Sequence, residues 1–461
     1  MSGAYWFDPT ILREYDIRGV VGHTLGTGDA EAIGRAFATI AARDTGGKVF
    51  CVGYDGRLSS PDMETALISG LNSAGADAIR IGLGPTPMLY YSVHDLDTDG
   101  GIMITGSHNP PDNNGFKIML GKESFFGDRI QELGKLAASD DFNSGAGEIR
   151  YKPMLDRYVA RLTEEGRCLA PLKVAWDAGN GAAGEAMTKL TNNLPGEHLL
   201  LNEKINGNFP AHHPDPTVPE NLTQIIATVR NEGCDVGIAF DGDGDRIGVV
   251  DGKGEILWGD QILALLARPV LAARPGATII ADVKASQVLF DEVSRLGGEP
   301  LMWKTGHSLI KSKMAELDAP LAGEMSGHIF FADRYYGYDD ALYAAIRLLR
   351  VISSTGDSLA ALRASLPVRL NTPELRFECS DQRKFKAIGE VRSRLAVEGA
   401  TVDSCDGVRV STTDGWWLLR ASNTQPVLVA RCEARDRAGL LRLKEALVSQ
   451  LTKSGIAPPD F

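Results

Sequence analysis

Short apolar runs that end at an aspartate recur along the chain, at intervals of about one hundred residues. They cover residues 48–55, 173–177 and 277–282. A β-branched and apolar run followed by a polar loop is typical of a buried strand in an α/β unit. Each unit continues with further strand-like runs, which cover residues 78–83 and 101–105, then 199–201 and 236–240, and finally 301–304 and 321–324. We therefore predict three similar α/β domains with mixed sheets, although any large α/β chain shows some recurrence of this kind.

The pattern changes after about residue 367. Strand-like runs at 408–412 and 416–419 flank the turn Thr413-Asp414-Gly415, and a helical pattern covers residues 436–451. A turn of this kind between two apolar runs predicts a hairpin. We expect a smaller C-terminal α+β domain, and the four domains together to surround a central cleft. The predicted boundaries are 1–152, 153–255, 256–367 and 368–461.

Charge and cysteine content narrow the function classes. The formal net charge of −12 argues against broad nucleic-acid binding, which needs basic surface to displace phosphate counterions. A local basic cleft could still bind a phosphorylated substrate. The six cysteines are spread singly, which fits a reducing compartment better than a disulfide framework. No secretory signal or membrane-spanning run is visible, so we expect a cytoplasmic protein without a membrane partner.

The strongest chemical motif is Asp241-Gly-Asp243-Gly-Asp245-Arg246, which follows an apolar strand. In an extended loop, alternate residues point the same way, so we expect the three carboxylates to converge. Carboxylates held together repel each other and call for a hard divalent cation. An EF-hand is excluded because its sixth and twelfth positions would be Arg246 and Gly252 rather than Gly and Glu. A solvated acidic turn remains the alternative.

A second loop, Thr105-Gly-Ser107-His108-Asn-Pro110, also follows an apolar strand. A serine framed by small residues is approachable, although a loop serine is more often a turn or cap residue. The loop lacks the Gly-x-Ser-x-Gly elbow of hydrolases. A hydroxyl combined with a metal-binding loop favours phosphoryl chemistry instead, and Lys117 just beyond could act as an acid, a base or a phosphate contact.

Two further loops carry polar groups suited to a sugar phosphate. Glu324, Ser326 and His328 alternate in sequence, so we expect one face that reads vicinal hydroxyls. The segment from Arg420 to Pro426 offers a guanidinium with small hydroxyl and amide groups, which suit a phosphate. Either segment alone could be an ordinary polar turn. The sequence has neither a Walker A loop nor a GxGxxG fingerprint, so nucleotide binding is unsupported.

Together these loops, with Tyr15-Asp-Ile-Arg18-Gly19 near the start, resemble the α-D-phosphohexomutase superfamily, and most closely its bacterial phosphomannomutase/phosphoglucomutase type. The motifs match in order and spacing over nearly the whole chain. The resemblance implies four domains around one cleft, each contributing one main loop. It also implies a phosphoserine at Ser107 and Mg²⁺ held by Asp241, Asp243, Asp245 and a phosphoserine oxygen.

The same resemblance implies roles for the other loop residues. The catalytic candidates are Ser107, Lys117, His328, Arg246 and His108. Glu324 and Ser326 would bind sugar hydroxyls, while Arg420, Ser422, Asn423 and Thr424 would hold the phosphate that is not reacting. Further substrate-binding positions match Tyr15, Arg18, Lys284 and His307.

The function that these roles imply is the interconversion of hexose 1-phosphate and hexose 6-phosphate, of mannose or glucose, through a hexose 1,6-bisphosphate. We expect small-molecule hexose phosphates as the partners and a monomer or weak dimer. The alternatives are a phosphoglucosamine mutase, a metal-dependent sugar phosphatase and a non-catalytic protein that binds sugar phosphates.

Overall fold

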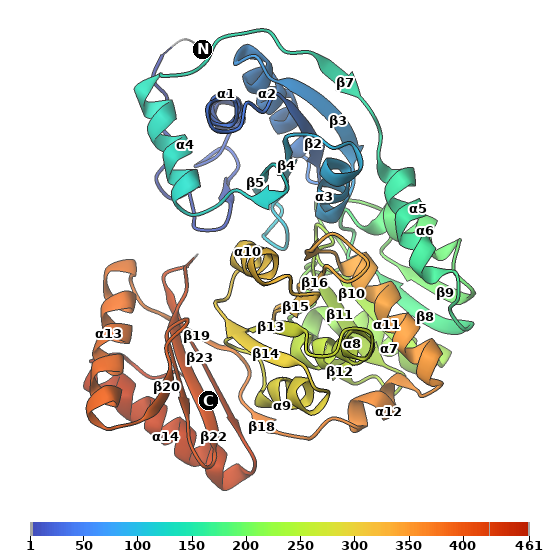
Figure 1. The fold of residues 1–461 in the computed structure, drawn as a ribbon, viewed down its shortest axis with the longest axis vertical. Coiled ribbons are helices and arrows are strands. Elements are labelled where there is room, and N and C mark those ends of the chain that lie inside the picture. The colour runs from blue at the N-terminus through green and yellow to red at the C-terminus, as the bar shows by residue number, and fades with distance from the viewer. Residues whose placement is uncertain (1–2, 424, 460–461) are drawn as a thin grey trace.

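The computed structural model describes residues 3–423 and 425–459 of the chain. Within this part, four sheets follow one another along the sequence, each packed against helices (Figure 1). The first three sheets mix parallel and antiparallel pairs, whereas the pairs of the fourth are antiparallel. The predicted fold class, three α/β domains followed by a smaller α+β domain, is confirmed.

The first sheet has the strand order β1-β5-β4-β2-β3-β7, with β6 paired to β5. Alternate residues of β2 face opposite helical layers, as the pleat of a strand requires. Phe50 packs toward α1 and α2, and Cys51 packs toward α3. The elements of this domain are β1 (Ile17–Val20), α1 (Thr27–Asp44), β2 (Val49–Tyr54), α2 (Ser60–Ser73), β3 (Asp77–Leu83), α3 (Thr86–Asp95), β4 (Gly100–Ile104), β5 (Asn113–Leu120), β6 (Glu123–Ser124), α4 (Asp128–Ser139) and β7 (Ile149–Tyr151).

The second and third sheets repeat one arrangement of strands. Read in the same direction, their orders are β9-β8-β10-β11-β12 and β14-β13-β15-β16-β17. The second domain contains α5 (Leu155–Gly166), β8 (Leu172–Asp177), α6 (Gly184–Thr191), β9 (Gly196–Leu201), η1 (Pro219–Leu222), α7 (Thr223–Glu232), β10 (Val236–Phe240), β11 (Ile247–Asp251) and β12 (Ile256–Leu257). The third contains α8 (Gly259–Ala273), β13 (Thr278–Asp282), α9 (Gln287–Arg295), β14 (Glu299–Trp303), α10 (His307–Leu317), β15 (Leu321–Gly323), β16 (Ile329–Phe331), β17 (Tyr338–Asp339), α11 (Ala341–Thr355) and α12 (Leu359–Ala364).

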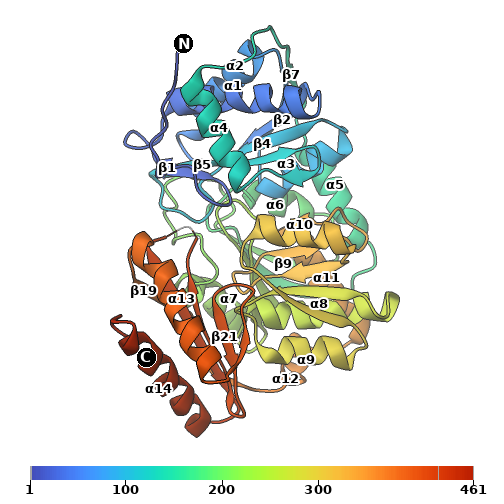
Figure 2. The same ribbon diagram turned by 60° about the vertical axis from the view of Figure 1, so that its left-hand side comes forward.

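The fourth sheet has the order β18-β23-β22-β21-β20, with β19 also paired to β23. The predicted hairpin is present, because β21 and β22 pair antiparallel on either side of the expected turn. Figure 2 shows α13 and α14 together over this sheet, and α14 covers the predicted C-terminal helix. The elements are β18 (Leu370–Asn371), β19 (Leu375–Glu378), α13 (Asp381–Val397), β20 (Thr401–Asp403), β21 (Val408–Ser411), β22 (Gly415–Ala421), β23 (Val427–Ala434) and α14 (Arg437–Lys453).

The buried apolar residues show how the domains are joined. One cluster runs through the first three domains and includes Leu89, Trp176 and Leu263. The C-terminal domain has a cluster of its own around Trp417 and Leu447. The first three domains therefore share a core, and the fourth is built as a separate unit. Among the described residues, no helix combines the length and the apolar character that crossing a membrane requires.

Candidate active site

Three of the predicted site loops occupy the same place in their sheets. In each case a strand lies parallel to one neighbour, and the loop after it returns the chain along an antiparallel neighbour. Residues 105–112 join β4 to β5 in this way, residues 241–246 join β10 to β11, and residues 324–328 join β15 to β16. In the fourth domain the loop after β22 leads to β23. The repeated fold thus supplies one loop from each domain.

Side chains from the first three loops meet each other across the domains. Ser107 Oγ donates a hydrogen bond to Asp241 Oδ2 over 2.9 Å, although 134 positions separate them. His328 Nε2 lies 3.2 Å from Asp245 Oδ1. All four residues are at most 4% exposed. The serine, the acidic loop and the histidine loop therefore form one buried cluster.

Ser107 is held in an uncommon backbone conformation. Its φ of +49° lies in the left-handed region, which residues other than glycine seldom adopt. Its N–H donates to Thr105 Oγ1 at 2.8 Å, and its Oγ lies 3.1 Å from His108 Nδ1. Burial and the positive charges of Arg246 and Arg18 hold the pKa of His108 well below its usual value. His108 is therefore a neutral imidazole beside the serine hydroxyl.

The acidic loop converges by turning, and the expectation of an extended loop was wrong. Asp241 Oδ1 accepts the N–H groups of Asp245 and Arg246, both at 3.1 Å. Gly244 makes the turn with a φ of +73° and donates its N–H to the carbonyl of Asp241. Asp241, Asp243 and Asp245 still come together, with ligand oxygens all within 4.8 Å of one another. Because the side chain of Asp241 accepts N–H groups from its own turn, the three carboxylates lie closer together than they would as alternate residues of a strand.

The three carboxylates carry different protonation tendencies. Burial, reinforced by the charges of Asp243 and Asp245, raises the pKa of Asp241 well above its usual value. Burial also opposes ionisation of Asp245, but the charges of Lys117 and His328 outweigh it and hold its pKa well below the usual value. Lys117 is an ion-pair partner of Asp243, at 2.7 Å, and of Asp245. Burial opposes the charge of its ammonium, but these two partners raise its pKa, so Lys117 supplies one positive charge to the acidic cluster.

The acidic cluster fits a divalent cation. Its donors are three carboxylates with no accessible surface, the oxygen set that Mg²⁺ prefers. Asp243 Oδ1 is buried and has no hydrogen-bond partner, and such an atom is costly unless something binds it. Ser107 Oγ adjoins the cluster through Asp241, so an oxygen on this serine would lie at its edge.

The loop at 324–328 is also a tight turn rather than an extended face. Glu324 donates its N–H to the carbonyl of His328 at 2.9 Å. The side chains face each other across the turn, with His328 Nδ1 2.8 Å from Glu324 Oε2 and 3.1 Å from Ser326 Oγ. Burial lowers the pKa of His328, but the neighbouring carboxylates, Asp245 first, raise it to about 9. The same contacts hold the pKa of Glu324 at about 2, against the effect of burial.

The fourth domain contributes a basic and polar loop. Arg420 is 5% exposed, and its Nε donates to Asp406 Oδ2 at 2.9 Å. Ser422 Oγ accepts the N–H of Gln425 at 3.2 Å. Thr424, the last of the predicted phosphate-binding residues, lies outside the described residues. The described part of the loop presents a guanidinium, a hydroxyl and backbone groups, as a phosphate-binding loop requires.

Tyr15 joins this loop to two other domains. Its hydroxyl donates to the carbonyl of Thr305 at 2.8 Å and accepts from Asn423 Nδ2 at 2.7 Å. One side chain from the first domain therefore contacts both the third and the fourth. Its ring also lies 6.3 Å from that of His307, so predicted substrate-binding residues of the first, third and fourth domains are neighbours here.

Three further basic candidates lie among these loops. Arg18 Nη1 donates to Asn109 Oδ1 at 3.3 Å, in the serine loop. Lys284 Nζ pairs with Glu374 Oε2 at 2.9 Å, which joins the third domain to the fourth. His307, at the start of α10, has a pKa well below its usual value because it is buried among positive charges. These positive and neutral donors suit anionic ligands.

Sequence reasoning missed several residues that complete the site. Arg57 and Asp55 form a buried ion pair whose arginine contacts the serine loop. A signal existed for this pair, because Asp55 ends the first of the recurring strand-like runs. No such signal existed for Asp339, because its strand β17 is only two residues long. The fold brings its Oδ2, which has no hydrogen-bond partner, to 3.9 Å from His307 Nδ1.

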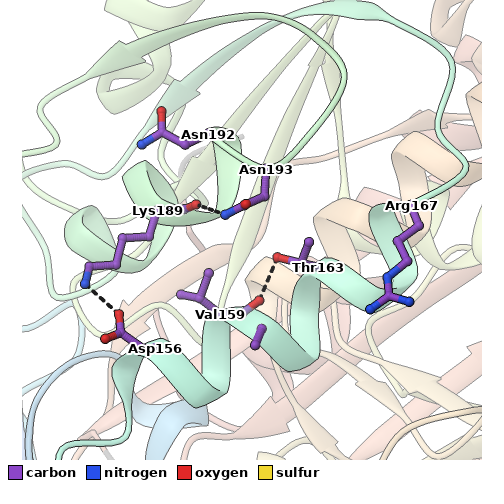
Figure 3. Close-up of a pocket in the computed structure, with 8 residues that line it drawn as sticks. Asp156, Val159, Thr163, Arg167, Lys189, Asn192 and Asn193 are labelled. Carbon is purple, nitrogen blue, oxygen red and sulfur yellow. Dashed lines mark hydrogen bonds and ion pairs between the residues drawn. The ribbon is translucent and has the colours of Figure 1, made fainter.

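A surface hollow of about 500 Å³ lies outside this cluster (Figure 3). It is open, and its lining residues come from α5, from α6 and from the segment that follows each of them. Its lysine, Lys189, is already paired with Asp156 at 2.6 Å. None of the predicted site residues lines it, so it adds nothing to the candidate site.

Comparison with protein families gives one consistent answer. The chain matches the four domains of phosphoglucomutase/phosphomannomutase, namely the alpha/beta/alpha domains I, II and III and the C-terminal domain. The matched residues are 9–143, 156–254, 258–370 and 374–450.

Individual relatives are similar over their whole length. A phosphomannomutase/phosphoglucomutase of Pseudomonas putida is 45% identical over 444 residues, which are 96% of each chain. A phosphoglucomutase of Neisseria gonorrhoeae is 42% identical and covers 94% of this chain and 95% of its own. A crystal structure of a phosphoglucomutase/phosphomannomutase family protein from Burkholderia thailandensis superimposes with a TM-score of 0.93, at 44% identity, over 99% of this chain and 100% of that one.

Proposed function

Because the chain belongs to the phosphoglucomutase/phosphomannomutase family, we propose that it converts hexose 1-phosphate and hexose 6-phosphate into each other through a phosphoserine at Ser107. It is a hexose-phosphate mutase, an isomerase of the kind that its relatives' names describe. The proposal concerns the route and the residues that carry it.

The hydrogen bond of 2.9 Å between Ser107 Oγ and Asp241 Oδ2 is the observation that supports this route most strongly. A phosphoryl group on Ser107 would bring negative charge against three buried carboxylates. One phosphate charge about 5 Å from one carboxylate costs roughly 3 kcal/mol at an effective dielectric near 20. A serine that carries phosphate here therefore needs a cation, and Asp241, Asp243 and Asp245 have the oxygens to hold one.

We propose Mg²⁺ as that cation, held by the three aspartates and an oxygen of the phosphorylated Ser107. When bound, it would neutralise the charge on the phosphoryl group during transfer. Arg246, the last residue of the acidic loop, adds a positive charge near Asp241 and Asp245.

In the first half-reaction, a sugar hydroxyl oxygen forms a bond to phosphorus and the bond from phosphorus to Ser107 Oγ breaks. His328 in its neutral form takes the proton from the hydroxyl. Lys117, which holds its proton among the aspartates, gives positive charge and a proton to the leaving serine oxygen. The product is a hexose 1,6-bisphosphate, which turns over and returns its other phosphoryl group by the reverse steps. His108 keeps the Ser107 hydroxyl oriented through its Nδ1.

The remaining residues hold the sugar and its second phosphate. Glu324 and Ser326 would accept and donate bonds with the hydroxyls, while Arg420, Ser422, Asn423 and Thr424 would hold the non-reacting phosphate. The other contacts proposed come from Tyr15, Arg18, Lys284 and His307. Transfer of this kind depends mainly on positioning and charge stabilisation, and the cluster supplies both.

We propose mannose and glucose phosphates as substrates, because the relatives are named for these two sugars. Those sugars differ at C2, whereas Glu324 and Ser326 would read hydroxyls elsewhere on the ring. The chief alternative within the same chemistry is a glucosamine phosphate. We further propose that the enzyme works in the cytoplasm as a monomer or weak dimer, and its six free thiols suit a reducing compartment.

The test combines one substitution with a substrate panel. Ser107→Ala should lower mutase turnover by about a thousandfold or more, since the group that carries the phosphate is gone. Turnover is measured with glucose, mannose and glucosamine 1-phosphates, with Mg²⁺ and with a chelator, and released inorganic phosphate is assayed in parallel. Intact mass of the wild type should show a phosphate adduct on the Ser107 peptide. Near-normal turnover of Ser107→Ala would exclude the route, and release of phosphate without isomerisation would indicate a phosphatase.

A further inference from the structure

The guanidinium of Arg57 donates hydrogen bonds to the backbone of the serine loop. This arginine lies in the loop after β2 and is 1% exposed. Its Nη2 donates to the carbonyls of Ser107 and Asn109, both at 2.7 Å. Its Nη1 donates to the carbonyls of Pro110, at 2.5 Å, and Asn113, at 2.9 Å. Three carbonyls of the serine loop and that of Asn113, the first residue of β5, thus converge on one side chain.

Asp55 completes this arrangement from the other side. It accepts the fifth donor of Arg57, Nε, at 3.2 Å on Oδ2. The same oxygen accepts Thr105 Oγ1 at 2.8 Å and the N–H of Gly106 at 3.2 Å. The pair therefore holds the residues before Ser107 through Asp55 and those after it through Arg57. All five N–H donors of the guanidinium are used, which a lysine ammonium with three donors at one point cannot reproduce.

The geometry that this pair maintains is one that the loop would not adopt by itself. Ser107 has a φ of +49°, which is disfavoured for a residue with a Cβ. Its carbonyl oxygen also packs closely against the acidic loop, so that a Cβ added to Gly242 would clash with it. With the carbonyl fixed between Arg57 and Gly242, the Oγ of Ser107 is aimed at Asp241.

Residues of the second domain pack against Arg57. The ring of Phe209 lies 5.1 Å from the guanidinium carbon. A Cβ added to Gly207 would lie 2.7 Å from Arg57 Cα and 2.6 Å from the carbonyl oxygen of Gly56. This close packing holds the backbone of Arg57 in place. The serine loop is consequently coupled to the same domain that carries the acidic loop.

We infer that Arg57, held by Asp55, is a positioning residue for phosphoryl transfer, which keeps Ser107 in the conformation that presents its Oγ to the acidic cluster. This inference rests on the proposed phosphoserine route. Arg57 touches neither the substrate nor the transferred group in this role, and acts through the backbone of the serine loop. A merely structural arginine would affect stability, whereas this one controls the rate at which Ser107 gains and loses phosphate.

The experiment compares Arg57→Lys with a matched control, Arg347→Lys. Arg347 is also buried and donates to the carbonyl of Asp333, at 2.9 Å, and to its Oδ2, at 2.6 Å, far from the serine loop in sequence. Dephosphorylated enzyme is mixed with hexose 1,6-bisphosphate, quenched, and weighed by mass spectrometry to give the rate constant for phosphorylation of Ser107. Arg57→Lys should slow this step and lower kcat about a hundredfold, the scale of a misplacement of about 1 Å, with KM changed less than threefold. Arg347→Lys should lower the Tm and leave the rate constant unchanged.

Each outcome either supports or overturns the positioning role of Arg57. A folded Arg57→Lys that is phosphorylated within twofold of the wild-type rate overturns the inference. If Arg57→Lys does not fold, Gly207→Ala, which presses on the Arg57 backbone, should slow phosphorylation about tenfold; a rate within twofold of the wild type overturns the inference. Wild-type enzyme that never gains the phosphate mass would instead overturn the phosphoserine route itself, so the two failures are distinguishable.

Discussion

His328 illustrates how a single buried side chain can be kept protonated. Its two ring nitrogens face carboxylates, Glu324 at 2.8 Å and Asp245 at 3.2 Å. An imidazolium can donate to both at once, whereas the neutral ring can donate to one only. Burial and Arg246, whose Nε lies 3.3 Å from Nε2, oppose this charge, but the carboxylates outweigh them and raise the pKa of His328 to about 9. A cation on Asp245 would reduce that attraction, which would return His328 toward the neutral form that a base requires.

This charge predicts a pH dependence of stability in chelator-treated enzyme. The folded pKa of about 9 lies above the unfolded value of 6.5. The native state therefore binds more protons, and the stabilisation is fully present below about pH 6.5 and lost as the pH rises through about 9. Relative to His328→Gln, the free energy of unfolding of the wild type should fall by about 3 kcal/mol between pH 6 and pH 10. Urea denaturation at several pH values measures this difference, and a constant difference would show that His328 is neutral in the fold.

At this scale the sequence predicts candidate site residues more readily than the contacts around them. Ser107 and the three aspartates are candidates because each of their loops follows an apolar strand and carries a distinctive motif. The ion pairs of Lys117 could not be predicted in this way, since its partners lie 126 and 128 positions away and only the fold brings them together. The same limit applies to Arg57, whose acceptors are backbone carbonyls that carry no residue signature.

At the scale of elements, the acidic turn depends on one glycine. Gly244 has a φ of +73°, and a Cβ there would lie 3.0 Å from Pro85 Cβ and 3.2 Å from Ala183 Cβ. The sequence showed that glycines separate the aspartates, but both an extended loop and a turn are compatible with that spacing. The hydrogen bonds from residues 245 and 246 to Asp241 decide between them, and these follow from tertiary structure rather than from local pattern.

Gly244→Ala should therefore weaken both the fold and the proposed metal site. A left-handed conformation costs an alanine about 1–2 kcal/mol, and the two close contacts add to this. We expect the free energy of unfolding to fall by about 1–3 kcal/mol, and half-maximal activation to require more Mg²⁺.

The matched control for this substitution is Gly233→Ala. Gly233 has a φ of +63° at the end of α7, with nothing within 4 Å of an added Cβ. It imposes the same backbone strain in the same domain without crowding, so its Mg²⁺ requirement should stay that of the wild type. Equal Mg²⁺ curves for the two variants would contradict the role of the turn.

At the scale of the whole molecule, the C-terminal domain is docked on the third domain through buried arginines. Arg409 Nη1 donates to the carbonyls of Val283 and Ala285, both at 2.7 Å, and its guanidinium lies over the ring of Trp416 at 3.7 Å. Burial lowers the pKa of Arg409 to about 10. Trp416 also packs with Leu418 against Val283 in a small apolar cluster. The four-domain order was readable from the sequence, but this joint was not, because its acceptors are again main-chain oxygens.

Arg409→Met should loosen this joint. Two carbonyls would lose their donor inside the protein, at a cost of about 1–3 kcal/mol each. We expect calorimetry to resolve an earlier unfolding transition for the C-terminal domain. Arg442→Met serves as the comparison, because the Arg442–Asp414 pair is an exposed ion pair of the same domain, of the kind that contributes about 1 kcal/mol or less. A single transition at an unchanged temperature for Arg409→Met would show that the apolar cluster alone holds the joint.

The position of Lys117 has a consequence for the enzyme when no ion occupies the proposed Mg²⁺ site. Because its ammonium is paired with Asp243 and Asp245, part of the negative charge of the acidic cluster is balanced from within even when no ion is supplied. We therefore expect enzyme stripped by a chelator to stay folded and to recover when the metal is restored, with no need for new synthesis. A cell short of magnesium would then keep a dormant stock of this protein rather than lose it to degradation.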